Sequence, residues 1–148
     1  MPPEVVRIKL PALYPKQHAV FFDPARYVVC EASTKSGKTA GALCWLLSGT
    51  INKPGSWLWV SPTYPQAKGQ GFERMKRLLG SADPGGRLTG WKANASELFI
   101  RMPGGSHMWF KGGDRPDAIY GPDYQGVVID EATRCKEEVW HATRSTLT

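Results

Sequence analysis

The 148-residue chain has 41% hydrophobic and 22% charged residues, a composition typical of one folded domain rather than of a disordered chain. No run approaches about 18 apolar residues, and no basic stretch precedes an apolar one at the N-terminus, so the sequence predicts neither a membrane span nor a signal peptide. Three cysteines without Cys-x-x-Cys spacing predict no disulfide framework or zinc site. The net charge of +6 favours an anionic partner, either nucleic acid or a nucleotide, although the basic residues are scattered.

The first half of the chain reads as an arm followed by two strands and two helices. Residues 1–25 are rich in proline and predict an arm that wraps a core. The apolar run at Tyr27–Glu31 predicts a strand buried on both faces. A helix follows and ends near residues 52–55, with Leu43, Leu46 and Leu47 on one side. "SWLWVSP" at 56–62 predicts a second strand.

The second half adds a helix, a hairpin and a third strand. The helix runs from Pro65 to Gly80 with one apolar stripe, formed by Phe72, Met75, Leu78 and Leu79. Residues 91–102 and 106–113 predict a hairpin around "PGG", in which Trp91 and Trp109 either pack across the strands or stack on bases. Residues 125–132 predict a third buried strand, and a helix begins at Glu137. This alternation of strands and helices predicts an α/β fold with a mostly parallel central sheet and an antiparallel hairpin.

The loop "STKSGKT" at 33–39 has the parts of a phosphate-binding loop. Gly37 lets the backbone approach a phosphate, Lys38 supplies a cation, and Thr39 opens the helix and supplies a hydroxyl for magnesium. The first glycine of the usual G-x-x-x-x-G-K-[ST] pattern is replaced by Ala32. The alternative is a polar helix cap with Ser36 as the N-cap residue.

The strand "VVIDEA" ends in two carboxylates and favours the nucleotide interpretation. A magnesium nucleotide needs a carboxylate at the C-terminal tip of a neighbouring strand, and hydrolysis needs a group that orients water. Asp130 would hold magnesium and Glu131 would polarise the attacking water. Alternatively, the pair consists of two surface acids or of charges at a helix N-terminus. An apolar strand ending in Asp-Glu about ninety residues after a Gly-Lys-Thr loop favours the first interpretation.

The loop "ASTKSGKT", the strand "VVIDEA" and the stretch "VSPTYPQAKG" together resemble the ATPase domain of phage terminase large subunits, the motors that package viral DNA. The resemblance implies a P-loop NTPase of the RecA-like class with a glutamate beside the Walker B aspartate, and ATP and Mg²⁺ as cofactors. It implies that Gln17 in "LYPKQ" contacts adenine. It also implies that the nucleotide phosphates are bound by the loop residues Ser33, Thr34, Lys35, Ser36, Gly37, Lys38 and Thr39.

The same resemblance implies partners and a setting. It implies non-specific binding of double-stranded DNA, a homo-oligomeric ring, contacts with a portal and a small terminase subunit, no membrane, and the host cytoplasm. A neighbouring subunit would supply a basic residue to the ATP site. Arg115 is the first candidate for that role, with Arg101 and Arg134 as competitors and a solvated loop arginine as the alternative.

The resemblance further implies a core that is incomplete at its C-terminus. Residues 1–25 would form the arm that carries the glutamine and residues 26–148 the ATPase core, with no nuclease domain. The strand after the acidic one would begin near Thr146 and lie between Tyr27–Glu31 and Val127–Asp130, which would otherwise be roughly 10 Å apart. Such a fragment would be poorly stable and slow in turnover. Two other functions stay open, a helicase-like DNA-stimulated ATPase and a nucleotide-binding remnant without turnover.

Overall fold

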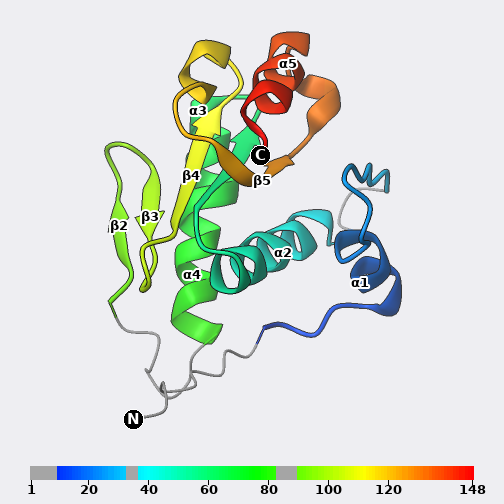
Figure 1. The fold of residues 1–148 in the computed structure, drawn as a ribbon. Helices are drawn as coiled ribbons and strands as arrows, with labels where there is room; N and C mark the ends of the chain where they lie inside the picture. The colour runs from blue at the N-terminus through cyan, green and yellow to red at the C-terminus, as the bar shows by residue number, and fades with distance from the viewer. Residues whose placement is uncertain (1–9, 33–36, 83–89) are drawn as a thin grey trace.

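Strand β1 (Ser56–Ser61) lies near the centre of a five-stranded sheet with the order β2-β3-β4-β1-β5 (Figure 1). This computed structural model describes residues 10–32, 37–82 and 90–148. β1 is parallel to both of its neighbours, β4 (His107–Gly112) and β5 (Tyr124–Ile129). The predicted mixed α/β fold with a parallel centre is therefore confirmed. None of the helices within the described ranges has the length and apolar character needed to cross a membrane.

The side chains of β1 are buried on both faces of the sheet. Trp57 and Trp59 pack in a cluster with residues of α2 (Lys38–Asn52) and α4 (Glu73–Ala82), whereas Leu58 and Val60 pack in a second cluster with residues of α5 (Glu137–Thr146). The uninterrupted apolar run "WLWV" fits a strand that is covered on both sides. Helices therefore cover both faces of the sheet.

One continuous helical segment connects β1 to the hairpin region. It begins with α3 (Tyr64–Gln66), passes through a π-helix (Ala67–Phe72) and continues as α4, ending two residues beyond the predicted Gly80. The predicted apolar stripe is buried at Phe72, Met75 and Leu79. π-Helical turns are rare and often lie at functional sites. This one begins six residues after the end of β1 and lies next to the acidic strand end described below.

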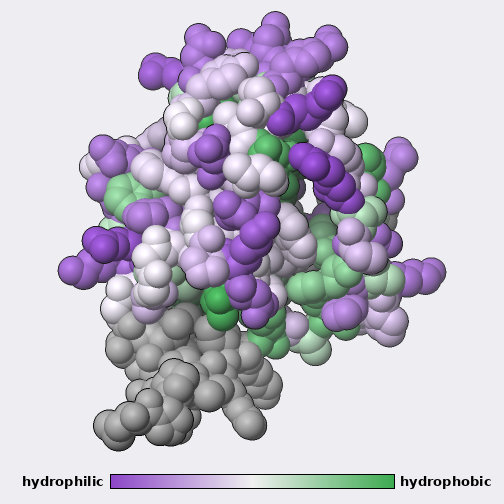
Figure 2. All heavy atoms as spheres, in the orientation of Figure 1, coloured by the Kyte–Doolittle hydropathy of each residue, from purple (hydrophilic) through white to green (hydrophobic). Residues whose placement is uncertain are grey.

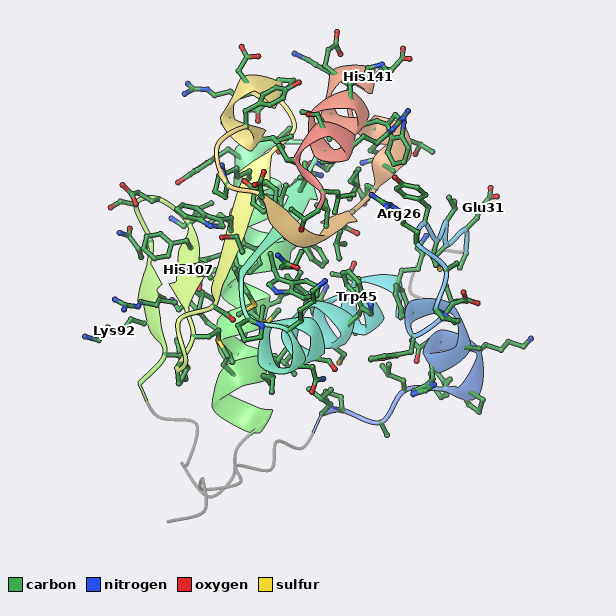
Figure 3. The ribbon with its side chains drawn as sticks, viewed as in Figure 1. Arg26, Glu31, Trp45, Lys92, His107 and His141 are labelled. Atoms are coloured by element: carbon green, nitrogen blue, oxygen red, sulfur yellow. The ribbon has the colours of Figure 1, made fainter. Side chains whose placement is uncertain are left out.

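The predicted two-stranded hairpin is instead a three-stranded antiparallel unit. Residues 91–102 form a hairpin by themselves, with β2 (Lys92–Asn94) and β3 (Phe99–Arg101), and β3 then pairs with β4 across the "PGG" turn. The turn at 95–98 went unpredicted because it has no glycine or proline. Trp109 packs on Phe99 across the strands, with ring centroids 4.9 Å apart. Figure 3 shows Lys92 projecting from the edge strand, away from the rest of the sheet.

The prediction of a buried strand at Tyr27–Glu31 is wrong. Residues 27–32 form no strand and are exposed, and the side chain of Val29 is 92% exposed. A β-branched run forms a strand only where a neighbour pairs with its backbone groups. Within the described residues, no ladder reaches this segment. Figure 3 labels Arg26, directly before this segment, and Glu31 within it. Figure 2 shows apolar side chains on the same side of the molecule, on a face that is otherwise largely hydrophilic.

The described part of the arm contains a short helix that the sequence did not predict. Helix α1 (Pro15–Phe21) packs against α2, on the side away from the hairpin (Figure 1). A Cβ atom at Gly41 of α2 would lie 2.4 Å from the Phe21 ring, so glycine is what permits this approach. Seven residues are too few for a helical period to stand out in sequence, and tertiary packing stabilises such helices. The contact brings α1 to the start of α2.

Strand β5 is less buried than predicted, because one of its edges is largely open. Val127, Val128 and Ile129 are half-buried. On the edge away from β1, the described residues supply only a bridge between Tyr124 and Leu147, and the Thr148 N–H donates to the Tyr124 carbonyl at 3.0 Å. The chain therefore returns from α5 parallel to β5. The resemblance placed the start of the next strand near this position.

Candidate nucleotide site

Gly37 sets the start of helix α2. Its φ of 83° and ψ of 17° lie in the left-handed region, where a side chain is unfavourable by about 1–2 kcal/mol. Its carbonyl accepts the first hydrogen bond of the helix, from the Gly41 N–H at 3.0 Å. The predicted loop residues Ser33, Thr34, Lys35 and Ser36 lie outside the described residues. What the structure describes is therefore the rim of the predicted phosphate loop, with Lys38 and Thr39 in the first helical turn.

Gln17 contacts this rim from helix α1. Its Nε2 donates to the Gly37 carbonyl at 3.2 Å, and its Oε1 accepts from the Tyr14 N–H at 2.8 Å. A Cβ atom at Gly37 would lie 2.1 Å from Nε2, so the glutamine occupies the space that any other residue would fill. The arm glutamine and the predicted phosphate loop are thus in direct contact, although twenty residues separate them in sequence.

The ammonium group of Lys38 donates to the carbonyl of Ala32, across the span of the loop. This bond joins the two described ends of the predicted loop. The Lys38 side chain therefore points back toward the residue that precedes the loop. A bound phosphate would compete with a neutral carbonyl for this cation, and charged acceptors bind ammonium groups more strongly.

The two predicted carboxylates follow directly after β5. The Asp130 N–H donates to the Val60 carbonyl at 2.8 Å, so Asp130 continues the parallel ladder with β1. Glu131 has φ 49° and ψ 51°, one of two positive-φ residues other than glycine in the described part of the chain. Such strain is often found at functional sites. The Glu131 carboxylate lies 3.5 Å from the Arg134 guanidinium; the Arg134 side chain is largely exposed and that of Glu131 about half exposed.

A cavity of about 210 Å³ brings the predicted residues together. Thr39, Asp130 and Glu131 line it, so the start of α2 and the end of β5 face the same space. Burial raises the pKa of Asp130, and the nearby Glu131 charge adds to that effect. A backbone hydrogen bond and the cations of Arg74 and Lys38 act on this pKa in the opposite direction. Both cations therefore lie close enough to act on Asp130.

Two glutamines that line this cavity, and an arginine that contacts one of them, were not predicted from sequence. Gln66 and Gln70 line it, and the Nη1 of Arg74 donates to the Oε1 of Gln70 at 3.2 Å. All three belong to the helical segment that follows β1. Two glutamines four residues apart, at the start of a helix after a buried strand, were a signal that could have been read from "PTYPQAKGQ".

The three arginines considered for a role in a neighbouring site lie at different places. Arg115 is exposed, directly before the short 3₁₀ turn Pro116–Ile119. Arg101 is exposed at the end of β3, on the hairpin. Arg134 pairs with Glu131 of its own chain. Only Arg134 contacts the candidate site, and Arg115 and Arg101 are on surfaces that another subunit could reach.

The fold and the cavity define a class of α/β domain. Ligands of such domains bind at the carboxyl ends of parallel strands. Here the cavity lies where β1 and β5 end and α2 begins. Residues 29–147 match the family model described as "Terminase large subunit, T4likevirus-type, N-terminal". The chain therefore belongs to the family of terminase large subunits. No curated protein sequence shows significant similarity to it.

Solved structures share this fold. The ATPase domain of the large terminase of Thermus phage P74-26 superposes with a TM-score of 0.78 at 26% identity, covering 91% of this chain and 60% of that one. The large terminase of a thermophilic bacteriophage, solved in complex with ADP, gives a TM-score of 0.70 at 17% identity, covering 89% of this chain and 35% of that one. A second crystal form of the same terminase gives 0.73 at 18% identity, with 92% and 36% covered. The chain thus spans about 60% of the P74-26 domain and about a third of the ADP-bound terminase.

Proposed function

We propose that this chain binds and hydrolyses ATP with Mg²⁺, as the N-terminal part of a terminase large subunit that drives double-stranded DNA into a procapsid. The observation that carries the proposal is the cavity shared by Thr39, Asp130 and Glu131, next to the loop rim held by Gln17 and Lys38. Family membership and the ADP complex of the thermophilic phage terminase support it.

The residues around the cavity fit a magnesium nucleotide. Mg²⁺ prefers oxygen ligands and retains several waters, and Thr39 and Asp130 bring a hydroxyl and a carboxylate to one polar cavity from two different elements. When bound, Mg²⁺ would neutralise charge on the terminal phosphates. Lys38 and the loop residues Ser33, Thr34, Lys35, Ser36 and Gly37 would bind the phosphates, and Gln17 would contact the adenine.

Glu131 is the base in this proposal. Its side chain lines the cavity and is about half exposed, so it can accept a proton from a water held against the terminal phosphate. The Arg134 guanidinium at 3.5 Å restrains the direction of the carboxylate. The positive φ of Glu131 departs from the extended backbone of β5, so its side chain no longer follows the alternation of the strand.

The proposal extends to the wider assembly. The proposed motor is a homo-oligomeric ring on non-specific double-stranded DNA, which docks on a portal and cooperates with a small terminase subunit. In that ring Arg115 of one subunit would contact the nucleotide of the next. The net charge of +6 suits a protein that holds DNA without reading its sequence.

Replacing the two carboxylates one at a time tests the catalytic proposal. Glu131→Gln keeps the side-chain shape, so Mg-ATP binding should persist while turnover falls about 10²–10⁴-fold. Asp130→Asn should weaken the Mg²⁺ dependence of binding itself. Binding is measured with a fluorescent ADP in Mg²⁺ and in EDTA, and turnover by phosphate release. Glu138→Gln, which removes the same charge from an exposed position of α5, is the control. Equal and mild effects of both site variants would contradict the assignment.

A further inference from the structure

The cavity has a second group of polar residues that the proposed function leaves without a role. Gln66 and Gln70 lie one helical turn apart on the segment that follows β1, and both line the space that Thr39, Asp130 and Glu131 also line. The acidic pair and the start of α2 form one part of this lining, and the two amides form another. The two amides thus face the same space as the carboxylates that the proposed function uses.

The direction of each amide follows from its neighbour. Arginine is a donor only, so the atom of Gln70 that meets the Arg74 Nη1 at 3.2 Å has to be the oxygen. The Thr63 hydroxyl donates to the Gln66 Oε1 at 3.2 Å and accepts from the Gln66 backbone N–H at 3.4 Å. Each carbonyl oxygen thus has a partner on its own helical segment. Neither NH₂ group has a hydrogen-bond partner within the part of the chain that the structure describes.

Gln66 is half-buried and Gln70 is exposed, so both NH₂ groups are free to donate to an acceptor that enters the cavity. Amide donors bind anionic oxygens well, and preorganised donors aimed at developing charge stabilise transition states. The start of α2 would hold the nucleotide so that its terminal phosphate enters the same space. The oxygens of that phosphate are acceptors only. They also differ between ATP and ADP, because ADP has no atom at that position.

We propose that Gln66 and Gln70 donate to the terminal phosphate of bound ATP, and that Arg74 positions Gln70 by holding its carbonyl oxygen. This inference rests on the proposed nucleotide site and adds to it a contact that distinguishes ATP from ADP. Arg74 acts through Gln70 and is a positioning residue. A π-helix begins directly after Gln66 and contains Gln70, so it sets the spacing of the two side chains.

The experiment measures discrimination between nucleotide states and does not depend on turnover. Calorimetry gives the Kd of Mg-ADP with and without beryllium fluoride, which occupies the terminal phosphate position. The parent chain should bind the fluoride complex more tightly than ADP alone. Gln70→Met, similar in length but without a donor, should lower that preference about tenfold and leave the Kd for ADP within about twofold.

Further variants separate positioning from bulk charge. Arg74→Met should lower the preference as Gln70→Met does, and the double variant should be no worse than Gln70→Met alone, because one acts through the other. Arg74→Lys keeps a donor and should retain most of the preference. Arg77→Met removes the same charge from an exposed position of the same helix and should change nothing.

Two results would overturn the inference. One is an unchanged preference in Gln70→Met while ADP still binds, which would leave the proposed nucleotide site standing. The other is loss of ADP binding together with a lower melting temperature in Gln70→Met, which would show a purely structural role. A parent chain that binds no ADP at all would refute the proposed function and this inference together.

Discussion

Replacing Gly37 by alanine is the change whose cost the structure defines best. An alanine would have to adopt φ 83°, at a cost of about 1–2 kcal/mol. Its Cβ would also lie 2.1 Å from the Gln17 Nε2, which would have to move and give up its bond to the Gly37 carbonyl, at about 0.5–1.5 kcal/mol more. Gly37→Ala should therefore lower the free energy of unfolding by about 1.5–3.5 kcal/mol.

Two other glycines provide matched controls in a urea titration of the same chain. Gly104 has φ 92° with open space around its Cβ position, so Gly104→Ala should show the backbone cost of about 1–2 kcal/mol alone. Gly80 lies in α4 with open space, so Gly80→Ala should stabilise by about 0.5–1 kcal/mol. If Gly37→Ala were no more destabilising than Gly104→Ala, the contact between the arm and the loop rim would be refuted.

Three further predictions concern charge and chemistry around the site. Binding to unrelated DNA duplexes, measured by fluorescence anisotropy, should be independent of sequence and should fall about 10³-fold between roughly 50 and 200 mM salt if about six phosphates are neutralised; a flat salt response would contradict the DNA partner. Burial and the charges of Asp130 and Glu131 raise the pKa of the Cys135 thiol to about 11. Its alkylation, followed by mass spectrometry, should therefore still be rising about tenfold per pH unit near pH 10, and Glu131→Gln should accelerate it; a rate that levels off near pH 9 would argue against the proximity. Arg115→Ala should lower turnover about 10³-fold with nucleotide binding intact. Added Lys38→Ala chains should restore part of the turnover, because their Arg115 can contact the nucleotide of a neighbouring Arg115→Ala chain. If turnover is not restored, Arg115 does not have that role.

The buried strands and long helices were predictable because their apolar patterns match their burial. The run "WLWV" is apolar at every position, and both faces of β1 are covered. The stripe of Phe72, Met75 and Leu79 has helical spacing and faces the core. The same rule failed at Tyr27–Glu31, because apolar β-branched residues specify a strand only when a partner strand is present to pair with them.

The candidate site was partly predictable, for a chemical reason. A Gly-Lys-Thr loop and an Asp-Glu strand end belong to one reaction chemistry, so the sequence alone predicts that they meet at one cavity. The four-residue spacing of Gln66 and Gln70 is a much weaker signature, and Arg74 carries none. Their place at the cavity depends on the crossover from β1 and on a π-helical turn, neither of which has a clear sequence pattern. The contact of Gln17 with Gly37 likewise depends on how α1 packs on α2.

The most direct test of the nucleotide site is a calorimetric titration of Mg²⁺ and a non-hydrolysable ATP analogue into three chains. The parent should bind, and Lys38→Ala should bind at least about tenfold more weakly, because it removes the cation of the loop. Lys53→Ala removes the same charge at the opposite end of helix α2 and should bind as the parent does. Binding by Lys38→Ala equal to that of the parent, or no binding by the parent, would contradict the account.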